Sequence, residues 1–378
     1  MNPIYLDHNG TTPVDPEVAA LCAEMIARNF GNPSTRSSYG QRAKEAMERA
    51  RQQVAELVDC PPSDITFTSG ASEANNWLVK GMAFASPGVH IVTSTVEHPS
   101  IGKACDFVER LGLARVTRLE VDARGQVSPE QVAQAVGPET ALVSLMHSNN
   151  EVGTCMPLRE VADRLGGRDL VFHSDAAQSL GKLAFPMRAL GLNSSTLAGH
   201  KLYAPKGVGA LVFPAARKLE PLVHGAGQEG GRRSGTENVA LIAGFGLACE
   251  LARQRQAQEE QRQRRLRDLL WEQLQQELPG QLVRHGHPDQ CLPNTLNVSF
   301  LGVTGAELLA RCPGLAASTG PACHDGQIRL SGVLQALRID PEVGKGAVRL
   351  SLGKDSDEQQ VRQVVSLLVG AFQQLVGK

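Results

Sequence analysis

The sequence predicts an α/β fold in which a mostly parallel sheet is covered by helices on both faces. Short apolar segments alternate with helical segments over the first two thirds of the chain, which is typical of such sheets. Clusters of polar residues follow several of the apolar segments directly. The length of 378 residues allows one large domain or two, each able to bury a sizeable core.

The elements are expected in the following order. Helices run from about Pro16 to Ala27 and from Gln41 to Val58, and the turn residues Gly31-Asn-Pro-Ser34 separate them. Ile65–Thr68 is a short strand, and a helix from Gly70 to Met82 follows it. The next expected strands are Val89–Val96, Ala114–Val121, Ala141–Met146, Leu170–Phe172 and Thr196–Ala198, and the stretch after Lys201 turns into a further apolar strand.

Composition excludes several classes of protein. Lys and Arg number 38 against 39 Asp and Glu, with no long run of one sign, so neither nucleic acid nor an anionic membrane is the expected partner. The first residues lack a basic segment followed by an apolar one, and no run of ~18 apolar residues occurs, so we expect a cytoplasmic protein. The eight cysteines form no C-x-x-C pair, which favours reduced thiols and no metal site.

The polar clusters are expected to meet in one crevice. Ligands of open parallel sheets collect at the carboxyl ends of the strands. The clusters at these ends are Ser69–Ser72, Glu97–His98, His147–Glu151, His173–Gln178 and His200–Lys201. We therefore expect a binding site for a small molecule at this edge of the sheet.

Lys201 is the first candidate catalytic residue, because it lies between an apolar run and a glycine-rich turn. A desolvated lysine is a usable amine nucleophile and can form a Schiff base with a carbonyl cofactor such as pyridoxal phosphate. The alternative is a lysine at a strand end that points to water. Ser69 and Ser72, with the backbone N–H groups of the helix that starts at Gly70, form a candidate phosphate site; a simple capped helix start has the same pattern.

Four further residues have a cofactor role and an ordinary alternative. Asp175 suits the protonated ring nitrogen of pyridoxal phosphate, or a helix N-cap. Gln178 suits the ring hydroxyl, or lies on the surface. His98 suits stacking on the ring and proton transfer, or caps the helix at Pro99, and Asn150 suits the ring hydroxyl or stabilises a turn. Their joint order along the chain favours the cofactor.

The motifs together resemble those of the cysteine desulfurases, which with the selenocysteine lyases form a branch of the class V aminotransferase group. The resemblance covers nearly the whole chain. The motifs are Asp7-His-Asn-Gly-Thr-Thr-Pro13, Gly31-Asn-Pro-Ser34, Phe67-Thr-Ser-Gly-Ala-Ser-Glu73, Glu97-His98, Asn149-Asn-Glu-Val-Gly153, His173-Ser-Asp-Ala-Ala-Gln178, Gly199-His-Lys201, Arg233-Ser-Gly-Thr-Glu-Asn238 and Arg349-Leu-Ser-Leu-Gly353.

The resemblance implies the fold of type I pyridoxal phosphate enzymes and an obligate homodimer. A large domain, residues 14–250, would hold a mixed, mostly parallel central sheet. A smaller α+β domain, residues 1–13 and 251–378, would carry the catalytic cysteine loop. The charged segment Glu250–Glu277 is expected as a solvated connecting helix. Two strands are expected in the small domain, Asn294–Phe300 and Ala347–Leu352.

The resemblance also assigns the site residues. Thr236 would reach the phosphate of the partner subunit's cofactor, and Arg349 would clamp the substrate carboxylate, although a cross-strand salt bridge is its alternative. The expected cofactor-binding residues are Ala71, Ser72, His98, Asn150, Asp175, Gln178, His200, Lys201 and Thr236. Those expected to bind substrate are Asn9, Asn150 and Arg349.

Cys323 is the expected nucleophilic thiol. It lies in a polar, glycine-rich loop beside His324, which favours a partly ionised thiolate, whereas the other seven cysteines have ordinary surroundings. The resemblance makes it the cysteine that takes up the sulfur as a persulfide. Pro321 and His324-Asp325 depart from the usual desulfurase loop and are closer to selenocysteine lyases and DNA-phosphorothioation desulfurases; Ala198 stands where many desulfurases have a phosphate-binding serine.

The expected reaction converts L-cysteine to L-alanine. Lys201 and His98 would move the α-proton, Asp175 would keep the ring protonated, and Cys323 would attack the substrate sulfur. The alternatives are a selenocysteine lyase acting on L-selenocysteine, a class V aminotransferase, and a non-enzymatic sulfur carrier. A protein that accepts sulfur or selenium would be a further partner, which the sequence leaves unidentified.

Overall fold

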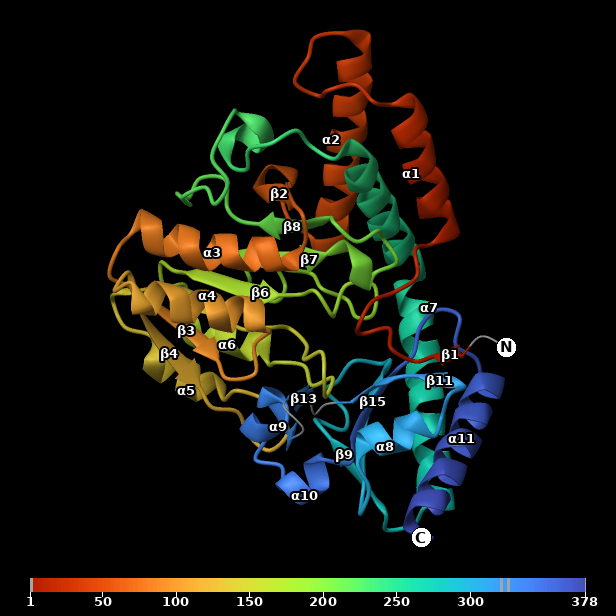
Figure 1. Cartoon of the computed structure of the whole chain (residues 1–378). Coiled ribbons are helices and arrows are strands. Elements are labelled where there is room, and N and C mark those ends of the chain that lie inside the picture. The colour runs from red at the N-terminus through yellow and green to blue at the C-terminus, as the bar shows by residue number, and fades with distance from the viewer. Residues whose placement is uncertain (1–2, 320–321, 325–326, 378) are drawn as a thin grey trace.

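The structure is a computed structural model that describes residues 3–319, 322–324 and 327–377, with only the backbone given for 322–324 and 327–329. Over these residues the large sheet has seven strands in the order β2-β8-β7-β6-β5-β3-β4 (Figure 1). β8 is antiparallel to both of its neighbours and the other pairs are parallel, so the predicted mixed, mostly parallel sheet is confirmed. The strands are β2 (Ile65–Thr68), β3 (Val89–Ser94), β4 (Ala114–Leu119), β5 (Thr140–Ser144), β6 (Val171–Asp175), β7 (Ser194–Ala198) and β8 (Gly209–Val212).

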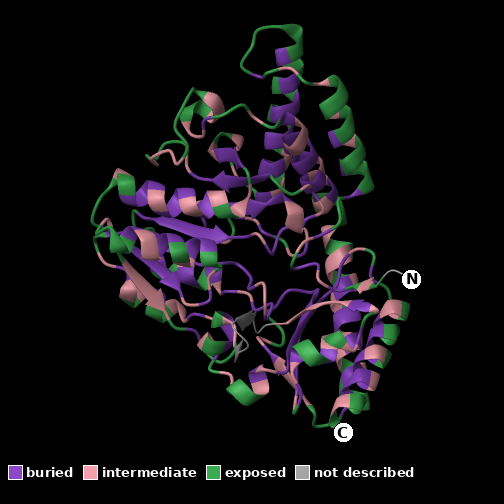
Figure 2. Ribbon diagram, in the orientation of Figure 1, coloured by how far each residue is buried: buried purple, intermediate pink, exposed green. Residues whose placement is uncertain are grey.

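Helices cover both faces of this sheet because neighbouring strand residues point to opposite sides. Ile91 and Leu142 pack into the hydrophobic cluster on one face, whereas Val92 and Val143 pack into the cluster on the other. Figure 2 shows the helices exposed on their outer sides and buried toward the sheet. The first face carries α3 (Ala71–Ala85) and α4 (Pro99–Arg110). The second carries α1 (Pro16–Arg28), α2 (Ser38–Val58), α5 (Pro129–Ala135), α6 (Leu158–Leu165) and the first half of α7 (Val239–Glu277).

β2, β3, β5, β6 and β7 all end at the same edge of the sheet. β2 is parallel to β7 because both are antiparallel to β8. β6 continues to Asp175, beyond the predicted end at Phe172, because His173, Ser174 and Asp175 pair with β7, and Nδ1 of His173 lies 2.9 Å from Oγ of Ser194 on that strand. The last three residues of this strand are polar, so the pattern of apolar residues does not predict where the strand ends.

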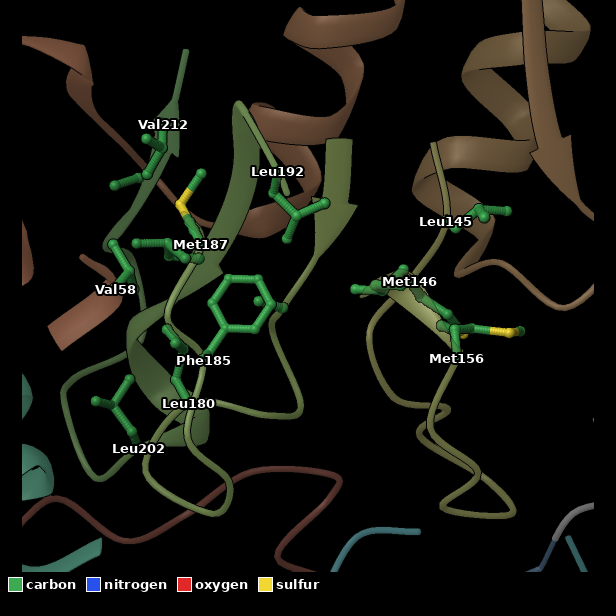
Figure 3. Packing of buried hydrophobic residues seen from close by; sticks show 14 of the residues in the cluster. Val58, Leu145, Met146, Met156, Leu180, Phe185, Met187, Leu192, Leu202 and Val212 are labelled. Carbon is green, nitrogen blue, oxygen red and sulfur yellow. The ribbon is translucent and has the colours of Figure 1, made fainter. Parts of the chain in front are cut away.

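The segment after β6 is anchored in the core beneath the sheet. Leu180, Phe185 and Met187 belong to the same buried cluster, and Figure 3 shows them grouped together. The main-chain N–H of Met187 also donates to the carbonyl of Val58 at the end of α2. This packing fixes the position of the polar residues that directly follow Asp175.

A second hydrophobic core lies around a four-stranded antiparallel sheet in the order β12-β15-β10-β9. The second half of α7 packs on it through Leu266, Leu270 and Leu274. The expectation of a solvated connecting helix is therefore wrong for this half, because a leucine stripe at helical spacing is buried among the charged residues. The strands are β9 (Leu282–His285), β10 (Thr295–Phe300), β12 (Ser318–Thr319) and β15 (Ala347–Ser351), and α8 (Gly305–Ala310), α9 (Gly332–Ala336), α10 (Pro341–Gly344) and α11 (Glu358–Val376) complete this part.

The N-terminal residues run beside the second core. β1 (Ile4–Tyr5) pairs in parallel with β11 (Leu315–Ala316), and Asp7 forms a parallel bridge with Ser351 of β15. β13 (Ala322–His324) and β14 (Gln327–Arg329) form an antiparallel pair in which Cys323 is opposite Ile328. Within the described residues, no helix combines the length and the apolar character needed to cross a membrane.

Candidate active site

A cavity of about 480 Å³ lies at the carboxyl ends of the strands of the large sheet. Residues at or after the ends of β2, β3, β5, β6 and β7 line it. Asn9 and Gly10 of residues 7–13, here called the N-terminal strip, and Arg349 of β15 complete the lining. The sequence prediction of one crevice at these strand ends agrees with this geometry. Except for Thr236 and Cys323, each residue predicted to bind cofactor or substrate lines the cavity: Asn9, Ala71, Ser72, His98, Asn150, Asp175, Gln178, His200, Lys201 and Arg349.

One end of the cavity is suited to an anion. Gly70 is the N-cap of the 15-residue helix α3 and no side chain caps the helix, so the N–H groups of its first turn face the cavity with the positive end of the helix dipole. Gly70 has φ 151°, and a β-carbon built on it would meet no atom within 4 Å. Lys206 lines the same cavity. Free backbone donors, open space and a cation are the features of a phosphate site.

His200 lies at this end as a neutral ring. Burial, followed by the nearby charge of Lys201, lowers the pKa of His200 to about 4. Its Nδ1 lies 3.1 Å from Oγ1 of Thr11 in the N-terminal strip. His200 can therefore provide a hydrogen bond to an anion but no positive charge.

Lys201 points into the middle of the cavity and has no carboxylate partner within ion-pair distance among the described residues. Its Nζ donates to the main-chain carbonyls of Asn9 at 2.6 Å and Gly10 at 2.7 Å. Burial, with a contribution from the charge of Arg349, lowers the pKa of Lys201 to about 8. A substantial fraction of this amine is neutral near physiological pH, as a nucleophile or base requires.

Asp175 forms the floor of the cavity and is only 5% exposed. Its Oδ1 accepts from the backbone N–H of Ala177 at 2.9 Å, and its Oδ2 accepts from Nδ2 of Asn75 at 2.7 Å. No described cation forms an ion pair with it. A buried carboxylate of this kind is matched by a protonated ring nitrogen, which would supply the missing positive charge.

His98 is the N-cap of α4, as its ordinary interpretation predicts, and it also lines the cavity, so capping does not exclude a role toward a ligand. Its Nδ1 lies 2.7 Å from Oγ of Ser100 and accepts from the backbone N–H of Ser100 at 3.2 Å. The rest of the ring is open to the cavity. Burial, and to a smaller extent the charge of Lys201, lowers the pKa of His98, while Asp175 opposes this effect.

Gln178 is held by a second buried lysine that the sequence did not single out as functional. Its Nε2 donates to the carbonyl of Asn9 at 2.9 Å, and its Oε1 accepts from Nζ of Lys182 at 3.1 Å. Nζ of Lys182 also donates to the main-chain carbonyl of Gln178. Burial lowers the pKa of Lys182 to about 7. The amide of Gln178 is therefore oriented by donors and acceptors on both sides.

Arg349 enters the cavity from β15. Its Nη2 pairs with Oδ1 of Asp7 at 2.6 Å, and its Nη1 donates to the carbonyl of Asn150 at 3.0 Å. Among the described residues, its buried Nε has no hydrogen-bond partner. The guanidinium is thus held in place by Asp7 and retains an unused donor.

Asn9 contributes mainly through its backbone. Its Nδ2 donates to the carbonyl of Asn150 and to Oγ1 of Thr295, and its Oδ1 accepts from Nδ2 of Asn294. The side-chain amide therefore joins the strip to the second core, whereas the carbonyl of Asn9 receives Gln178 and Lys201.

Two predicted residues lie elsewhere. Thr236 is exposed and lines a separate cavity of about 250 Å³, which shares Ser69, Gly207 and Val208 with the larger one. The side chain of Cys323 is outside the described part of the structure, and its backbone lies in β13. The seven cysteines with described side chains are free, and none of them lines the main cavity.

A further cavity of about 410 Å³ lies beyond Lys201, between Tyr203, Lys182 and α7. Three of its charged side chains pair with one another: Asp15 accepts from Lys354 at 2.6 Å and from Arg255 at 3.2 Å. The chemistry is therefore concentrated in the cavity at the strand ends. Among the described side chains, no group of three or more His, Cys, Asp or Glu could hold a metal ion.

Comparisons with known proteins agree with this geometry. Residues 4–364 match the family model described as aminotransferase class-V. The chain is 40% identical over 382 residues to the cysteine desulfurase IscS of Acinetobacter baumannii strain AYE, covering 99% of this chain and 93% of the relative. A solved NifS-like protein superposes with a TM-score of 0.91 at 32% identity over the full length of both chains. A solved structure described as SspA in complex with cysteine has a TM-score of 0.81 at 33% identity, covering 92% of this chain and 98% of that one.

Proposed function

The chain belongs to the class V aminotransferase family, and we propose that it is a pyridoxal phosphate-dependent cysteine desulfurase that converts L-cysteine to L-alanine. The observation that carries the proposal is the position of Lys201 in the cavity. Its partly neutral amine lies in one space with the uncapped start of α3 and the unpaired carboxylate of Asp175. These groups are complementary to the aldehyde, the phosphate and the ring nitrogen of the cofactor, respectively.

The described residues fit pyridoxal phosphate as follows. The first turn of α3, with Ala71 and Ser72, would bind the phosphate beside Lys206 and His200. Asp175 would hold the ring nitrogen in its protonated form, and Gln178 would lie beside the ring hydroxyl with Asn150. When bound, the cofactor supplies an aldehyde that condenses with amines and a ring that withdraws electrons from the adjacent carbon.

Side chains of the protein would bind the substrate, transfer the proton and take up the sulfur. Arg349 would bind the substrate carboxylate, since its fork is already oriented by Asp7 and it has an unused donor. Lys201, once released, would remove and return the α-proton. The thiolate of Cys323 would form an S–S bond with the substrate sulfur while the Cβ–S bond breaks, and the electron pair left on carbon would take up a proton to give alanine.

The pKa values and positions of the other thiols support Cys323 as the nucleophile. Burial raises the pKa of Cys155 to about 12, so its reactive thiolate form is scarce. The pKa values of Cys60 and Cys105 are likewise raised to about 12. Of the thiols whose side chains are described, none reaches the cavity, which leaves the cysteine of β13 as the candidate.

The test is to load the full-length protein with pyridoxal phosphate and measure alanine, sulfide and 2-oxo acids from L-cysteine and, separately, L-selenocysteine. We expect alanine and sulfide in equal amounts from cysteine in the presence of a thiol reductant. Turnover of selenocysteine alone would indicate a selenocysteine lyase, and loss of the amino group to a 2-oxo acid would indicate an aminotransferase.

Borohydride reduction followed by peptide mapping identifies the lysine that holds the cofactor. We expect the label on Lys201 and none on Lys182, whose amine has a low pKa but is bound to Gln178 and does not line the cavity. Label on Lys182 would overturn the assignment of the site.

We propose a two-fold dimer as the active form. The position of Thr236 outside the main cavity supports this, because its side chain is exposed beside Ser69 and available to a second subunit. Phe30 is 71% exposed and stacks on the half-exposed Tyr39 near the ends of α1 and α2, where a partner would cover both rings. A monomer by light scattering at assay concentration, with full turnover, would contradict the dimer.

A further inference from the structure

A chain of buried hydrogen bonds joins Asp175 to His98 along the wall of the cavity. Nδ2 of Asn75 lies 2.7 Å from Oδ2 of Asp175 and 2.8 Å from Oγ of Ser100. Oγ of Ser100 lies 2.7 Å from Nδ1 of His98. Asn75 is 0% exposed and Ser100 is 8% exposed, so water does not compete for these groups.

The direction of each hydrogen bond in this chain follows from the chemistry of its ends. The carboxylate of Asp175 can only accept, so the amide of Asn75 must present its nitrogen to it. The two hydrogens of that nitrogen are then used by Asp175 and Ser100. Oγ of Ser100 accepts from Asn75, and its own hydrogen is left for Nδ1 of His98. The backbone N–H of Ser100 also points at Nδ1.

We propose that Asn75 and Ser100 are positioning residues that hold His98 as a neutral ring with its proton on Nε2, the nitrogen on the cavity side. A proton on Nδ1 would face two other hydrogens, that of the Ser100 hydroxyl and that of the Ser100 backbone N–H, and would have no acceptor. The charged ring is disfavoured for the same reason. Of the charged groups around the ring, Lys201 acts in the same direction, and Asp175 acts against it.

This assignment changes the role of His98 in the proposed desulfurase reaction, on which it rests. A nitrogen that carries the proton of a neutral imidazole is a hydrogen-bond donor and has no lone pair for a base. His98 would therefore donate a hydrogen bond to the ligand, and the α-proton would be moved by Lys201 alone. This replaces the shared role that the sequence suggested for the two residues.

The polarity of the chain can be reversed by a single change. In Asn75→Asp the introduced carboxyl group has one hydrogen when protonated, which the carboxylate of Asp175 would take, and none when ionised, so in neither state does it donate to Ser100. The hydroxyl of Ser100 would then donate to the introduced carboxyl group, and its oxygen would become an acceptor for Nδ1. We expect a titration midpoint of His98 higher by about one pH unit, because the hydroxyl of Ser100 no longer donates to Nδ1 and an added acidic group favours the charged ring.

The measurement is solid-state ¹⁵N NMR of sedimented, histidine-labelled full-length protein, with and without pyridoxal phosphate, between pH 5 and 9. The signals of His98 are assigned by their loss in His98→Gln. In the unchanged protein we expect an unprotonated Nδ1 and a protonated Nε2 throughout most of this range. Ser100→Ala removes the hydroxyl link between residue 75 and His98, so adding Asn75→Asp to it should shift the titration of His98 less than in the single variant, by the added charge alone. Ser100→Thr should keep the original pattern, and Ser128→Ala, which removes a serine cap at the distant helix α5, should also leave it unchanged.

A proton on Nδ1 of the unchanged protein would overturn the proposal, and this result needs no variant to fold. An unshifted titration of His98 in a folded Asn75→Asp protein would also overturn it. Alanine release is assayed on the same samples, so the two proposals fail separately: the ring state is measured without turnover, and an inactive protein with the expected ring state would refute only the desulfurase function.

Discussion

The two walls of the active-site cavity are built from different contacts. The sheet wall, Asn75, His98, Ser100 and Asp175, is a chain of side-chain hydrogen bonds within the layer formed by α3, α4 and β6. The strip wall is formed by Asp7–Gly10 and Arg349, where main-chain carbonyls receive Lys201 and Gln178 and one ion pair joins β15 to the N-terminus.

The two walls therefore have different roles in binding. The side chains of the sheet wall bind one another and can set proton positions before any ligand enters, although Oδ1 of Asn75 has no hydrogen-bond partner among the described residues. In the strip wall, Lys201 is held by neutral main-chain carbonyls, so its charge is not compensated by a carboxylate, whereas Arg349 is paired with Asp7. The strip wall also joins segments 342 residues apart, as in the pair Asp7–Arg349, so it depends on the two cores being in contact.

The largest effect is expected from a residue that belongs to neither wall. Cys323→Ala should reduce cysteine turnover by orders of magnitude, because no other group can form the S–S bond. Binding of pyridoxal phosphate should remain, since both walls are unchanged. Alanine release and cofactor absorbance measure the two properties. Cys155→Ala is the matched control and should be close to wild type; wild-type turnover in Cys323→Ala would exclude this cysteine as the nucleophile.

Arg349→Lys tests the strip wall. Lysine keeps the charge but cannot bind Asp7, Asn150 and a carboxylate at once with a planar fork. Loss of a charged hydrogen bond of roughly 1.5–3 kcal/mol should lower kcat/KM about 10- to 100-fold, mainly through KM. Steady-state kinetics with L-cysteine measures this. Asp7→Asn, which keeps the guanidinium, is the comparison, and equal kinetics for Arg349→Lys and wild type would contradict the carboxylate role.

Lys182→Met tests the cation buried beneath the strip wall. Because the pKa of Lys182 is about 7 in the folded protein and near 10.5 when unfolded, the unfolded chain binds more protons between these values. Wild-type stability should therefore rise with pH through this window, and the ammonium should be most costly below pH 7. Each unit of pKa difference corresponds to about 1.4 kcal/mol. Lys182→Met should therefore be more stable than wild type by roughly 2–4 kcal/mol at pH 6, and this gain should decrease toward pH 10.

Denaturant unfolding of the cofactor-free proteins at pH 6 and pH 9 measures this gain. Lys206→Met, at an exposed lysine that lines the main cavity, is the control and should show little dependence on pH. A gain for Lys182→Met that grew with pH would contradict the assigned direction.

Glu97→Gln is the smallest expected effect and tests the acid buried beneath the sheet wall. Burial raises the pKa of Glu97 to about 8, and its Oε2 has no hydrogen-bond partner, while Oε1 accepts from Ser94 and Met146. Glu97 binds more protons in the folded than in the unfolded protein between pH 4.5 and 8, so its contribution to wild-type stability should fall as pH rises through this window. A neutral amide avoids this loss.

We expect Glu97→Gln to be about 1–2 kcal/mol more stable than wild type at pH 9, with no gain at pH 5, because an unpartnered buried amide offsets part of the benefit. Thermal unfolding at both pH values measures it. The pH dependence is opposite to that of Lys182→Met, and the same sign in both variants would refute the distinction between the two walls.

Much of the fold could be predicted because its signals are local. Ile65–Thr68 was placed without error, and most other strands within one to three residues, since apolar runs bounded by turn residues define them. Two local patterns misled the prediction: His173 and Ser174 interrupt an apolar run yet are buried in β6, and the charged residues of α7 conceal the stripe Leu266, Leu270 and Leu274.

The candidate site could be predicted in part. Lys201, Asp175 and His98 lie at or just after the ends of strands. Their positions in the sequence therefore predict that they meet in one cavity, as the structure shows. Asn75, Ser100 and Lys182 were not singled out as functional. The only sequence signal for Asn75 is a polar residue one helical turn after Ala71, on the face of α3 that turns toward the cavity.

By itself, the sequence determined the alternation of strands and helices, the edge of the sheet where polar residues gather, and the identity of the groups that meet there. These depend on the period of apolar residues and on the direction of parallel strands, which are properties of neighbouring residues. The tertiary structure alone decided which of these groups donate, which accept and which carry charge. The pKa of Lys201, the pairing of Arg349 with Asp7 and the chain from Asp175 to His98 depend on burial and on distances of about 3 Å between distant segments, and no local pattern in the sequence specifies such distances.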